Sequence, residues 1–330
     1  MEYGLYAPIV MASAGTAEGE RAISEALNSL PSGRRDAQFD LSTSLLMRAD
    51  ALGFNLVLFA ERHLGADISA WVLASALGAR FENIRPLVAV HPGLWNPVLV
   101  AKLAASLDRI CVGRMALNIV NGWFDREFEM FGGKVLQGDD RYQRTSEFLE
   151  ILIGLWTHET FSFNGKFYNI ENGQLLLKPA SPKPPEFFSV SRGDAGIELI
   201  ARTSDWWFVE LPKSDDPLEA LREIEASITG MRTRAERYGR TIRFAINPFV
   251  SLGSNFEEAY QTSIKRMFEF DPERAEARFA SSVRAGCIGT PKVVRAQIKR
   301  FSDLGIDLAL LKFVPSLDIL EDIGIEIVNA

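Results

Sequence analysis

The sequence is poor in the residues that most metal and disulfide sites need. It contains only three His and two Cys, with no His-x-His pair and no His-Glu-x-x-His motif. Enzymes that hydrolyse through metals draw on several His and carboxylate ligands, so we expect no metal site. Cys111 and Cys287 form no disulfide framework, as is typical of proteins from a reducing cytosol.

Long apolar runs and basic tracts are also lacking. No segment reaches the roughly 18 uninterrupted apolar residues of a membrane span, and the start, Met-Glu-Tyr-Gly-Leu, lacks a signal-peptide pattern. Lys and Arg do not cluster among aromatic residues, and the formal net charge is −7, so nucleic acid is not an expected partner. We therefore expect a cytoplasmic protein that acts on a small molecule and has no membrane contact.

The order of the apolar segments predicts alternating strands and helices. Short buried strands are expected at residues 3–10, 55–60, 84–90, 115–120, 186–190, 206–210, 242–250 and 308–314. Eight strand–helix units over 330 residues favour a closed (β/α)8 TIM barrel of the α/β class over an open doubly wound sheet.

No internal repeat, linker or low-complexity tract divides the chain, so we predict one domain, residues 1–330. Residues 12–37 are mostly small and polar and predict a long insertion after the first strand. Residues 161–177 predict a small antiparallel hairpin, with a turn at Asn164-Gly165.

In a TIM barrel the active site lies at the carboxyl ends of the strands. In this sequence polar and aromatic residues gather at these points, whereas the strand starts are plain. The predicted strand ends carry Pro8, Glu61 to His63, His91 to Trp95, Asn118 to Trp123, residues 189–193, Glu210 and residues 270–289.

The strand predicted at residues 115–120 carries the strongest site signal. It is apolar on both faces except for Asn118, which must therefore satisfy a buried neighbour or bind a ligand. Trp123, Phe124 and Glu127 follow closely. A buried amide, aromatics and a carboxylate in so short a stretch are more typical of a site than of plain packing.

Two segments have the composition of phosphate cradles. Arg141 and Tyr142 follow Gly138-Asp139-Asp140, with the Asp residues as expected helix caps, so both lie in the first turn of a long helix. Ser191 and Arg192 lie in the Gly-containing segment 189–196, ahead of another predicted helix. Hydroxyls, an Arg and free helix amides suit a bound phosphate.

Several further motifs, taken together with these segments, match a known protein family. They are Gly113 to Phe124, Glu127-Phe128, Asp140-Arg141-Tyr142, Glu147-Phe148-Leu149, Leu155-Trp156, Ser204 to Phe208 and Ile288-Gly289-Thr290-Pro291. With this set, the chain resembles the bacterial luciferase-like, two-component flavin monooxygenases over nearly its whole length. It is most similar to the alkanesulfonate and dimethylsulfone monooxygenase branch, and less so to the pyrimidine-ring-opening branch.

The resemblance implies an FMNH2-dependent monooxygenase that oxygenates a small organic substrate with O2, such as an alkanesulfonate or a sulfone. A separate NAD(P)H-dependent flavin reductase would supply the reduced FMN. By resemblance, the cofactor-binding residues are Ala60, Glu61, Asn118 and Glu127 at the isoalloxazine ring, Arg141 and Tyr142 along the ribityl phosphate arm, and Ser191 at the phosphate. Two positions depart from the family pattern: Asn121 replaces a usual Thr or Ser, and Ser-Val-Ser-Arg-Gly replaces Gly-Gly-Ser-Ser.

The flavin carries the chemistry in such enzymes, so the protein must position the substrate and exclude water. Trp95, Trp123 and Phe124 are the expected walls of the substrate pocket. The candidate catalytic residues are His91, His63 and Arg284. By resemblance, residues 270–289 form a lid in which Arg284 meets an anionic substrate.

The resemblance also implies a homodimer or homotetramer that pairs through the helix expected at residues 68–79, which is apolar on more than one face. The sequence alone does not exclude three other functions. They are an oxidoreductase of the same superfamily that uses the deazaflavin coenzyme F420, a non-catalytic flavin-binding barrel, and a metal-free hydrolase.

Overall fold

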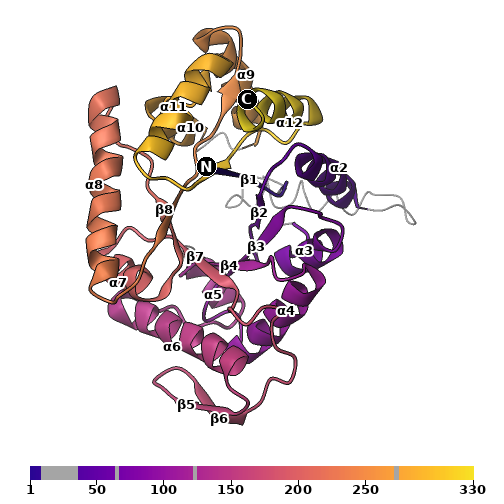
Figure 1. Cartoon of the computed structure of the whole chain (residues 1–330), viewed down its shortest axis with the longest axis vertical. Coiled ribbons are helices and arrows are strands. Elements are labelled where there is room, and N and C mark those ends of the chain that lie inside the picture. Colours follow the sequence, from indigo (N-terminus) through magenta and orange to yellow (C-terminus); the bar gives the residue numbers. More distant parts are fainter. Residues whose placement is uncertain (9–35, 64–66, 122–124, 271–274) are drawn as a thin grey trace.

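The chain forms a closed barrel of eight parallel strands surrounded by helices (Figure 1). The computed structural model describes residues 1–8, 36–63, 67–121, 125–270 and 275–330. The barrel strands are β1 (Glu2–Tyr6), β2 (Leu56–Phe59), β3 (Arg85–Val90), β4 (Ala116–Ile119), β7 (Glu186–Ser189), β8 (Trp206–Val209), β9 (Arg243–Ile246) and β12 (Leu308–Leu311). Their order around the barrel is β1-β12-β9-β8-β7-β4-β3-β2, which confirms the predicted TIM barrel.

Helices cover the outside of the barrel. They are α2 (Ala37–Ala51), α3 (Ala70–Gly78), α4 (Pro97–Ile110), α5 (Asp125–Met130), α6 (Gly138–Thr157), α7 (Asp194–Thr203), α8 (Pro217–Glu236), α9 (Phe256–Phe270), α10 (Ala275–Arg284), α11 (Pro291–Asp303) and α12 (Leu317–Ile323), with a π-helical end, η1 (Gly324–Val328). In the described part of the chain, no helix combines the length and hydropathy needed to cross a membrane.

Two small sheets lie outside the barrel. The antiparallel pair β5 (Phe161–Asn164) and β6 (Asn169–Gly173) is the predicted hairpin, and it projects beyond α6 in Figure 1. The parallel pair β10 (Ser251–Leu252) and β11 (Ile288–Gly289) joins the segment after β9 to the segment before α11.

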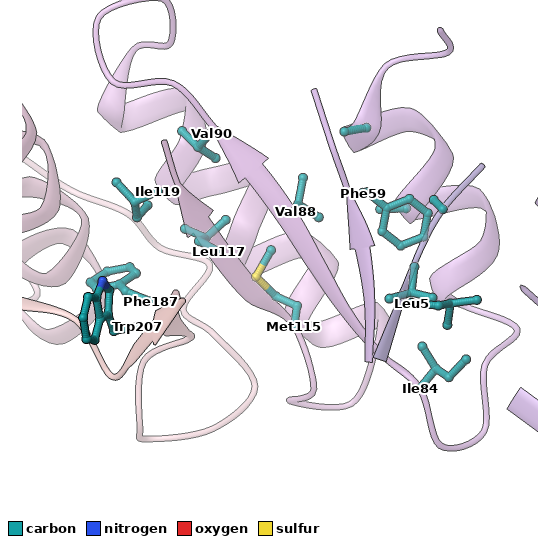
Figure 2. Close-up of a cluster of buried hydrophobic side chains, with 14 of the residues drawn as sticks. Leu5, Phe59, Ile84, Val88, Val90, Met115, Leu117, Ile119, Phe187 and Trp207 are labelled. Carbon is teal, nitrogen blue, oxygen red and sulfur yellow. The ribbon is translucent and has the colours of Figure 1, made fainter. Parts of the chain in front are cut away.

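Side chains along the barrel strands alternate between two apolar layers. Outward-facing residues such as Val88, Leu117 and Phe187 pack between the strands and the helices (Figure 2). Inward-facing residues fill the barrel: Leu56, Leu58, Leu87, Ala116, Phe188, Trp206, Phe208, Ala245, Leu308 and Leu310. Because both faces are buried, the strands appear in the sequence as nearly continuous apolar runs.

An ionic network closes the amino end of the barrel. The Glu186 carboxylate, at the start of β7, accepts hydrogen bonds from Arg85 Nη2 at 2.7 Å and Trp206 Nε1 at 3.0 Å, and it pairs with Lys183 and Arg243. Burial alone would raise its pKa, but the Trp206 and Arg85 bonds and the positive charges lower it to about 2. This end is therefore occupied by internal partners, which leaves the carboxyl end for a ligand.

Three expectations need correction. The strand expected at residues 242–250 is broken after Ile246, and the chain then joins β11 as β10, because Pro248 has no N–H for a ladder bond. Asp139 and Asp140 do not cap α6 but lie in its first turn, where Asp140 pairs with Lys166 at 2.6 Å. Residue 37 begins α2, and residues 12–35 of the predicted insertion lie outside the described residues.

Candidate functional site

The inner face of the barrel changes from apolar to largely polar at its carboxyl end. Strand alternation places a last inward residue above the apolar cluster on each strand. In order from β1, these inner-ring residues are Tyr6, Lys312, Asn247, Glu210, Val190, Val120, His91 and Ala60. The polar ring is the expected place for a ligand in this fold.

Asn118 lies just below this ring, on the inner face of β4, as predicted. In the strand register its neighbours are Ala89 of β3 and Phe188 of β7, and only 6% of the residue is exposed. Among the described residues, none donates a hydrogen bond to its buried Oδ1. An unpaired buried acceptor is costly, so this amide is suited to a polar ligand edge.

His91 and His63 form a pair at the mouth. His91 Nδ1 lies 3.4 Å from His63 Nε2, and His91 is only 2% exposed. Burial, with a smaller contribution from the charge of His63, lowers the pKa of His91 to about 4. The ring of Trp95 lies 6.0 Å from that of His63 and 6.0 Å from that of Trp71. The structure therefore brings together His63, His91 and Trp95, which the sequence predicted at the site.

Arg141, Tyr142 and Ser191 meet at the start of α7. Tyr142 OH lies 3.4 Å from Ser191 Oγ, and Arg141 Nη2 donates to Tyr142 OH at 3.3 Å. The first amides of α7 receive no side-chain cap, because the preceding residue is Gly193. We call Arg141, Tyr142, Ser191 and these amides the phosphate cradle. The cradle supplies hydroxyls, a guanidinium and the positive end of a helix, which together suit a phosphate group.

Two packing details support Ser191 as the hydroxyl of the cradle. The other nearby Ser, Ser189, is buried and shares a 2.8 Å hydrogen bond with Ser204 Oγ. Gly196 leaves room for Ser191: a Cβ there would lie 2.0 Å from Ser191 Oγ and 2.7 Å from Tyr142 Cε1. A larger residue at 196 would push both side chains out of place.

Besides Asn118, the three other residues predicted beside the flavin ring lie in different settings. Ala60 follows β2 on the inner ring. Glu61 is 8% exposed, and its Oε2 accepts hydrogen bonds from Ser69 Oγ and Ala70 N, both at 3.1 Å, so it holds the start of α3. Burial raises the pKa of Glu61. Glu127 is 5% exposed within the short helix α5, which follows β4.

Of the remaining predicted residues, Arg284 is bound to a neighbouring segment, and two aromatic residues are not described. Arg284 ends α10, where its Nε donates to Pro212 O at 3.4 Å and its Nη1 lies 3.7 Å from Asp215 Oδ1. It thus contacts the segment between β8 and α8. Trp123 and Phe124 lie outside the described residues, as do residues 271–274 of the predicted lid.

A cleft of about 570 Å³ lies beside the segment between β3 and α4. Trp95 lines it together with Gly93, Leu94, Asn96, Gly132, Gly133, Lys134, Leu136, Asp140, Arg144, Lys166, Phe167 and Tyr168. Arg144 is 5% exposed and donates to Lys134 O at 2.8 Å. Three cationic side chains against one Asp make this cleft more positive than the protein as a whole, so it is suited to an anion.

Four residues of the mouth and the cleft were not predicted from the sequence: Tyr6, Asn247, Lys312 and Arg144. Lys312 could have been predicted, because it is spaced by two residues from Leu310 and by four from Leu308. It therefore falls on the same strand face as these two residues, at the end of an apolar strand. Tyr6 and Asn247 had the same signal at the ends of β1 and β9. Arg144 had none, because its burial depends on the distant hairpin residue Tyr168 and on Gly93.

A barrel with a polar mouth, a phosphate cradle and a buried His pair is the arrangement expected of a TIM-barrel enzyme that binds a phosphorylated cofactor. The family model for luciferase-like monooxygenases matches residues 1–308, and the chain belongs to this family of flavin-dependent enzymes. This finding confirms the resemblance predicted from the sequence. An FMNH2-dependent dimethylsulfone monooxygenase of Pseudomonas putida is 29% identical over 324 residues, covering 88% of this chain and 87% of that protein.

Solved structures show the same fold in proteins of differing activity. A riboflavin lyase with modified FMN and riboflavin has a TM-score of 0.77 at 17% identity, covering 100% of this chain and 90% of that one. An F420-dependent secondary alcohol dehydrogenase has a TM-score of 0.72 at 17% identity, with 99% and 96% covered. At these identities the likeness concerns the fold alone. Within the residues that the structure describes, no three His, Cys, Asp or Glu are grouped as a metal site.

We predict that His91 makes the fold acid-sensitive. Its pKa is about 4 in the folded protein against an ordinary 6.5, so the unfolded chain binds more protons between these values. Stability is then lost as the pH falls from 6.5 towards 4, by about 3 kcal/mol in total. His91→Asn should flatten the dependence of the unfolding free energy on pH, measured by urea denaturation across this range.

His158, exposed at the end of α6, offers the matched control. His158→Asn should retain the wild-type pH dependence. A wild-type slope in His91→Asn would show that His91 does not titrate with a lowered pKa.

Proposed function

We propose that the protein is an FMNH2-dependent two-component monooxygenase that uses O2 to oxygenate a small organosulfur compound, an alkanesulfonate or a sulfone. The whole chain, residues 1–330, would act as one domain, and a flavin reductase would supply the reduced cofactor. The choice of FMN is supported mainly by Asn118, whose buried Oδ1 has no hydrogen-bond donor among the described residues. Asn118 lies in the mouth, and the phosphate cradle lies beside the mouth. Sequence similarity to a dimethylsulfone monooxygenase supports the substrate class.

In this proposal each predicted cofactor residue has a defined task. Arg141, Tyr142 and Ser191 hold the phosphate of FMN at the start of α7. Asn118 pairs with a polar edge of the isoalloxazine ring, and Ala60, Glu61 and Glu127 border the ring. Bound reduced flavin supplies the electrons that activate O2.

The His pair and the aromatic residues serve the substrate side. His91 is neutral at physiological pH, because burial keeps its pKa near 4, so it takes part in hydrogen bonds rather than supplying a charge. His63 lies 3.4 Å away and shares this role, while Trp95 keeps water from both rings. Trp123 and Phe124 would complete this wall, and Arg284 would meet an anionic substrate from α10.

The test is to mix the purified protein with reduced FMN without oxygen and then admit O2 in the presence of a sulfone. We expect reduced FMN to bind with a dissociation constant of micromolar order. We also expect slower reoxidation than that of free flavin, and oxygenated product. Reoxidation at the free-flavin rate would contradict the proposal. Binding of reduced coenzyme F420 in place of FMN would favour the hydride-transfer alternative, and binding without product would favour a non-catalytic barrel.

Asn118→Leu should weaken flavin binding while the apo protein remains folded. The substitution leaves the polar ring edge of the flavin unpaired in a buried site, which costs roughly 1–3 kcal/mol of binding free energy. Fluorescence titration of FMN gives the affinity, and thermal unfolding without FMN gives the stability.

Ile119→Val is a matched control, because Ile119 lies on the same strand but faces the helices. It should cost roughly 0.5–1.5 kcal/mol of stability and leave the flavin affinity unchanged. If Asn118→Leu instead unfolds the apo protein with little change in affinity, Asn118 serves the fold.

We further propose a homodimer or homotetramer that pairs through α3 and α4. Val72 of α3 and Leu99 of α4 are large apolar side chains that are 63% and 60% exposed, and they lie on two helices that contact each other. Light scattering at micromolar concentration should give at least twice the monomer mass, and Val72→Asp with Leu99→Asp should reduce it. The exposed pair Val293 and Leu218 on other helices provides a control double variant. A monomeric wild type would disprove this pairing.

A further inference from the structure

Lys312 is a cation on the inner face of the barrel mouth. It directly follows β12, in which Leu308 and Leu310 face inward and Leu311 faces the helices, so alternation directs Lys312 inward. Its contact confirms this direction, since Lys312 Nζ lies 5.2 Å from the ring centre of Tyr6, which packs against the inner apolar cluster.

Tyr6 and Asn247 complete a small donor group around Lys312. Asn247 Nδ2 donates a hydrogen bond of 3.2 Å to Tyr6 OH. The hydroxyl oxygen of Tyr6 acts as the acceptor in this bond, which leaves its proton to be donated elsewhere. Lys312 and Tyr6 therefore present an ammonium and a hydroxyl donor on adjacent strands, with Asn247 fixing the orientation of the hydroxyl.

Among the described residues, no carboxylate lies within the 4.0 Å of an ion pair from the ammonium group of Lys312. The one acidic residue of the inner ring, Glu210, pairs with Arg192 and Lys213 instead. Below Lys312 the barrel is filled by aliphatic side chains such as Leu310. A half-buried cation over an apolar floor attracts an anion strongly, because the local dielectric constant is low.

The position of this group relative to the phosphate cradle is also informative. In the closed order of eight strands, β12 lies opposite β4, and β1 lies opposite β7. Asn118 lies on β4, and Ser191 of the cradle follows β7. Lys312 and Tyr6 thus face these residues across the mouth. A phosphate held by the cradle lies on the opposite side, so Lys312 and Tyr6 remain free to bind a different negatively charged group.

We propose that Lys312 and Tyr6, oriented by Asn247, form an oxyanion-binding subsite opposite the phosphate cradle. The chemistry it recognises is a delocalised negative charge on oxygen. Two sources fit: the sulfonate or carboxylate of a substrate, and the pyrimidine edge of reduced, anionic flavin. The identity of the source rests on the proposed function, but the existence of the subsite does not.

Lys312→Met tests the subsite by binding, without turnover. The first pair of probes is methanesulfonate and the neutral dimethyl sulfone, titrated calorimetrically into the protein. The second pair is reduced and oxidised FMN. We expect a roughly 10- to 100-fold weaker affinity for methanesulfonate or for reduced FMN, whose ring is anionic, as for loss of a charged hydrogen bond. The affinity for the other member of that pair, the neutral sulfone or oxidised FMN with its uncharged ring, should not change. Selective loss of methanesulfonate identifies the substrate as the source, and selective loss of reduced FMN identifies the flavin.

Three further variants separate binding from folding. Lys312→Arg should retain most of the affinity for the anion, and Tyr6→Phe should lose part of it. Lys299→Met, on the surface of α11 where Lys299 pairs with Asp303, should bind all four probes as the wild type does. Wild-type affinities in Lys312→Met, or equal loss for both members of each pair, would overturn the subsite. Failure of wild-type protein to use FMN and O2 would instead refute the proposed function alone.

Discussion

The alternation of side chains along eight parallel strands is the constraint on which the rest of this structure depends. Outward residues must meet helices and inward residues must fill the barrel, so nearly every strand position is apolar. Inward positions escape this requirement only at the two ends of the strands, and at the carboxyl end they face the mouth. The polar residues His91, Asn247 and Lys312 occupy such positions without disturbing the core beneath them. Asn118 lies one layer lower, where a polar side chain is costly unless a ligand pairs with it.

The two ends of the barrel manage charge in opposite ways. At the amino end, the Glu186 carboxylate is bound by Arg85, Trp206, Lys183 and Arg243, and its pKa falls to about 2. At the carboxyl end, His91 loses its charge through burial, and Lys312 has no carboxylate partner among the described residues. Internal partners therefore stabilise the amino end. The carboxyl end keeps polar groups without internal partners, and a ligand that pairs with them would be stabilised there. This difference identifies the functional end from the chain's own residues.

The sequence was sufficient for the barrel because its signal is local. Each strand is a short apolar run, and the spacing of eight such runs leaves few other topologies. The placement of Asn118, His91 and Ser191 followed, because each lies in or directly after a strand. Contacts between distant segments could not be predicted. One example is the attachment of Arg284 to Pro212. These contacts depend on how helices and loops fold back over the barrel, which periodicity does not encode.

The segment between β3 and α4 links the mouth to the neighbouring cleft. Its first residue, His91, faces His63 inside the mouth, and Trp95, four residues later, contacts His63 and also lines the cleft. Between them, Gly93 has a φ of +99°, and a Cβ there would lie 2.2 Å from Arg144 Cζ. Arg144 is itself held by Lys134 O. The packing around the His pair is thus continuous with that of the cleft, through Trp95 on one side and through the close approach of Gly93 to Arg144 on the other.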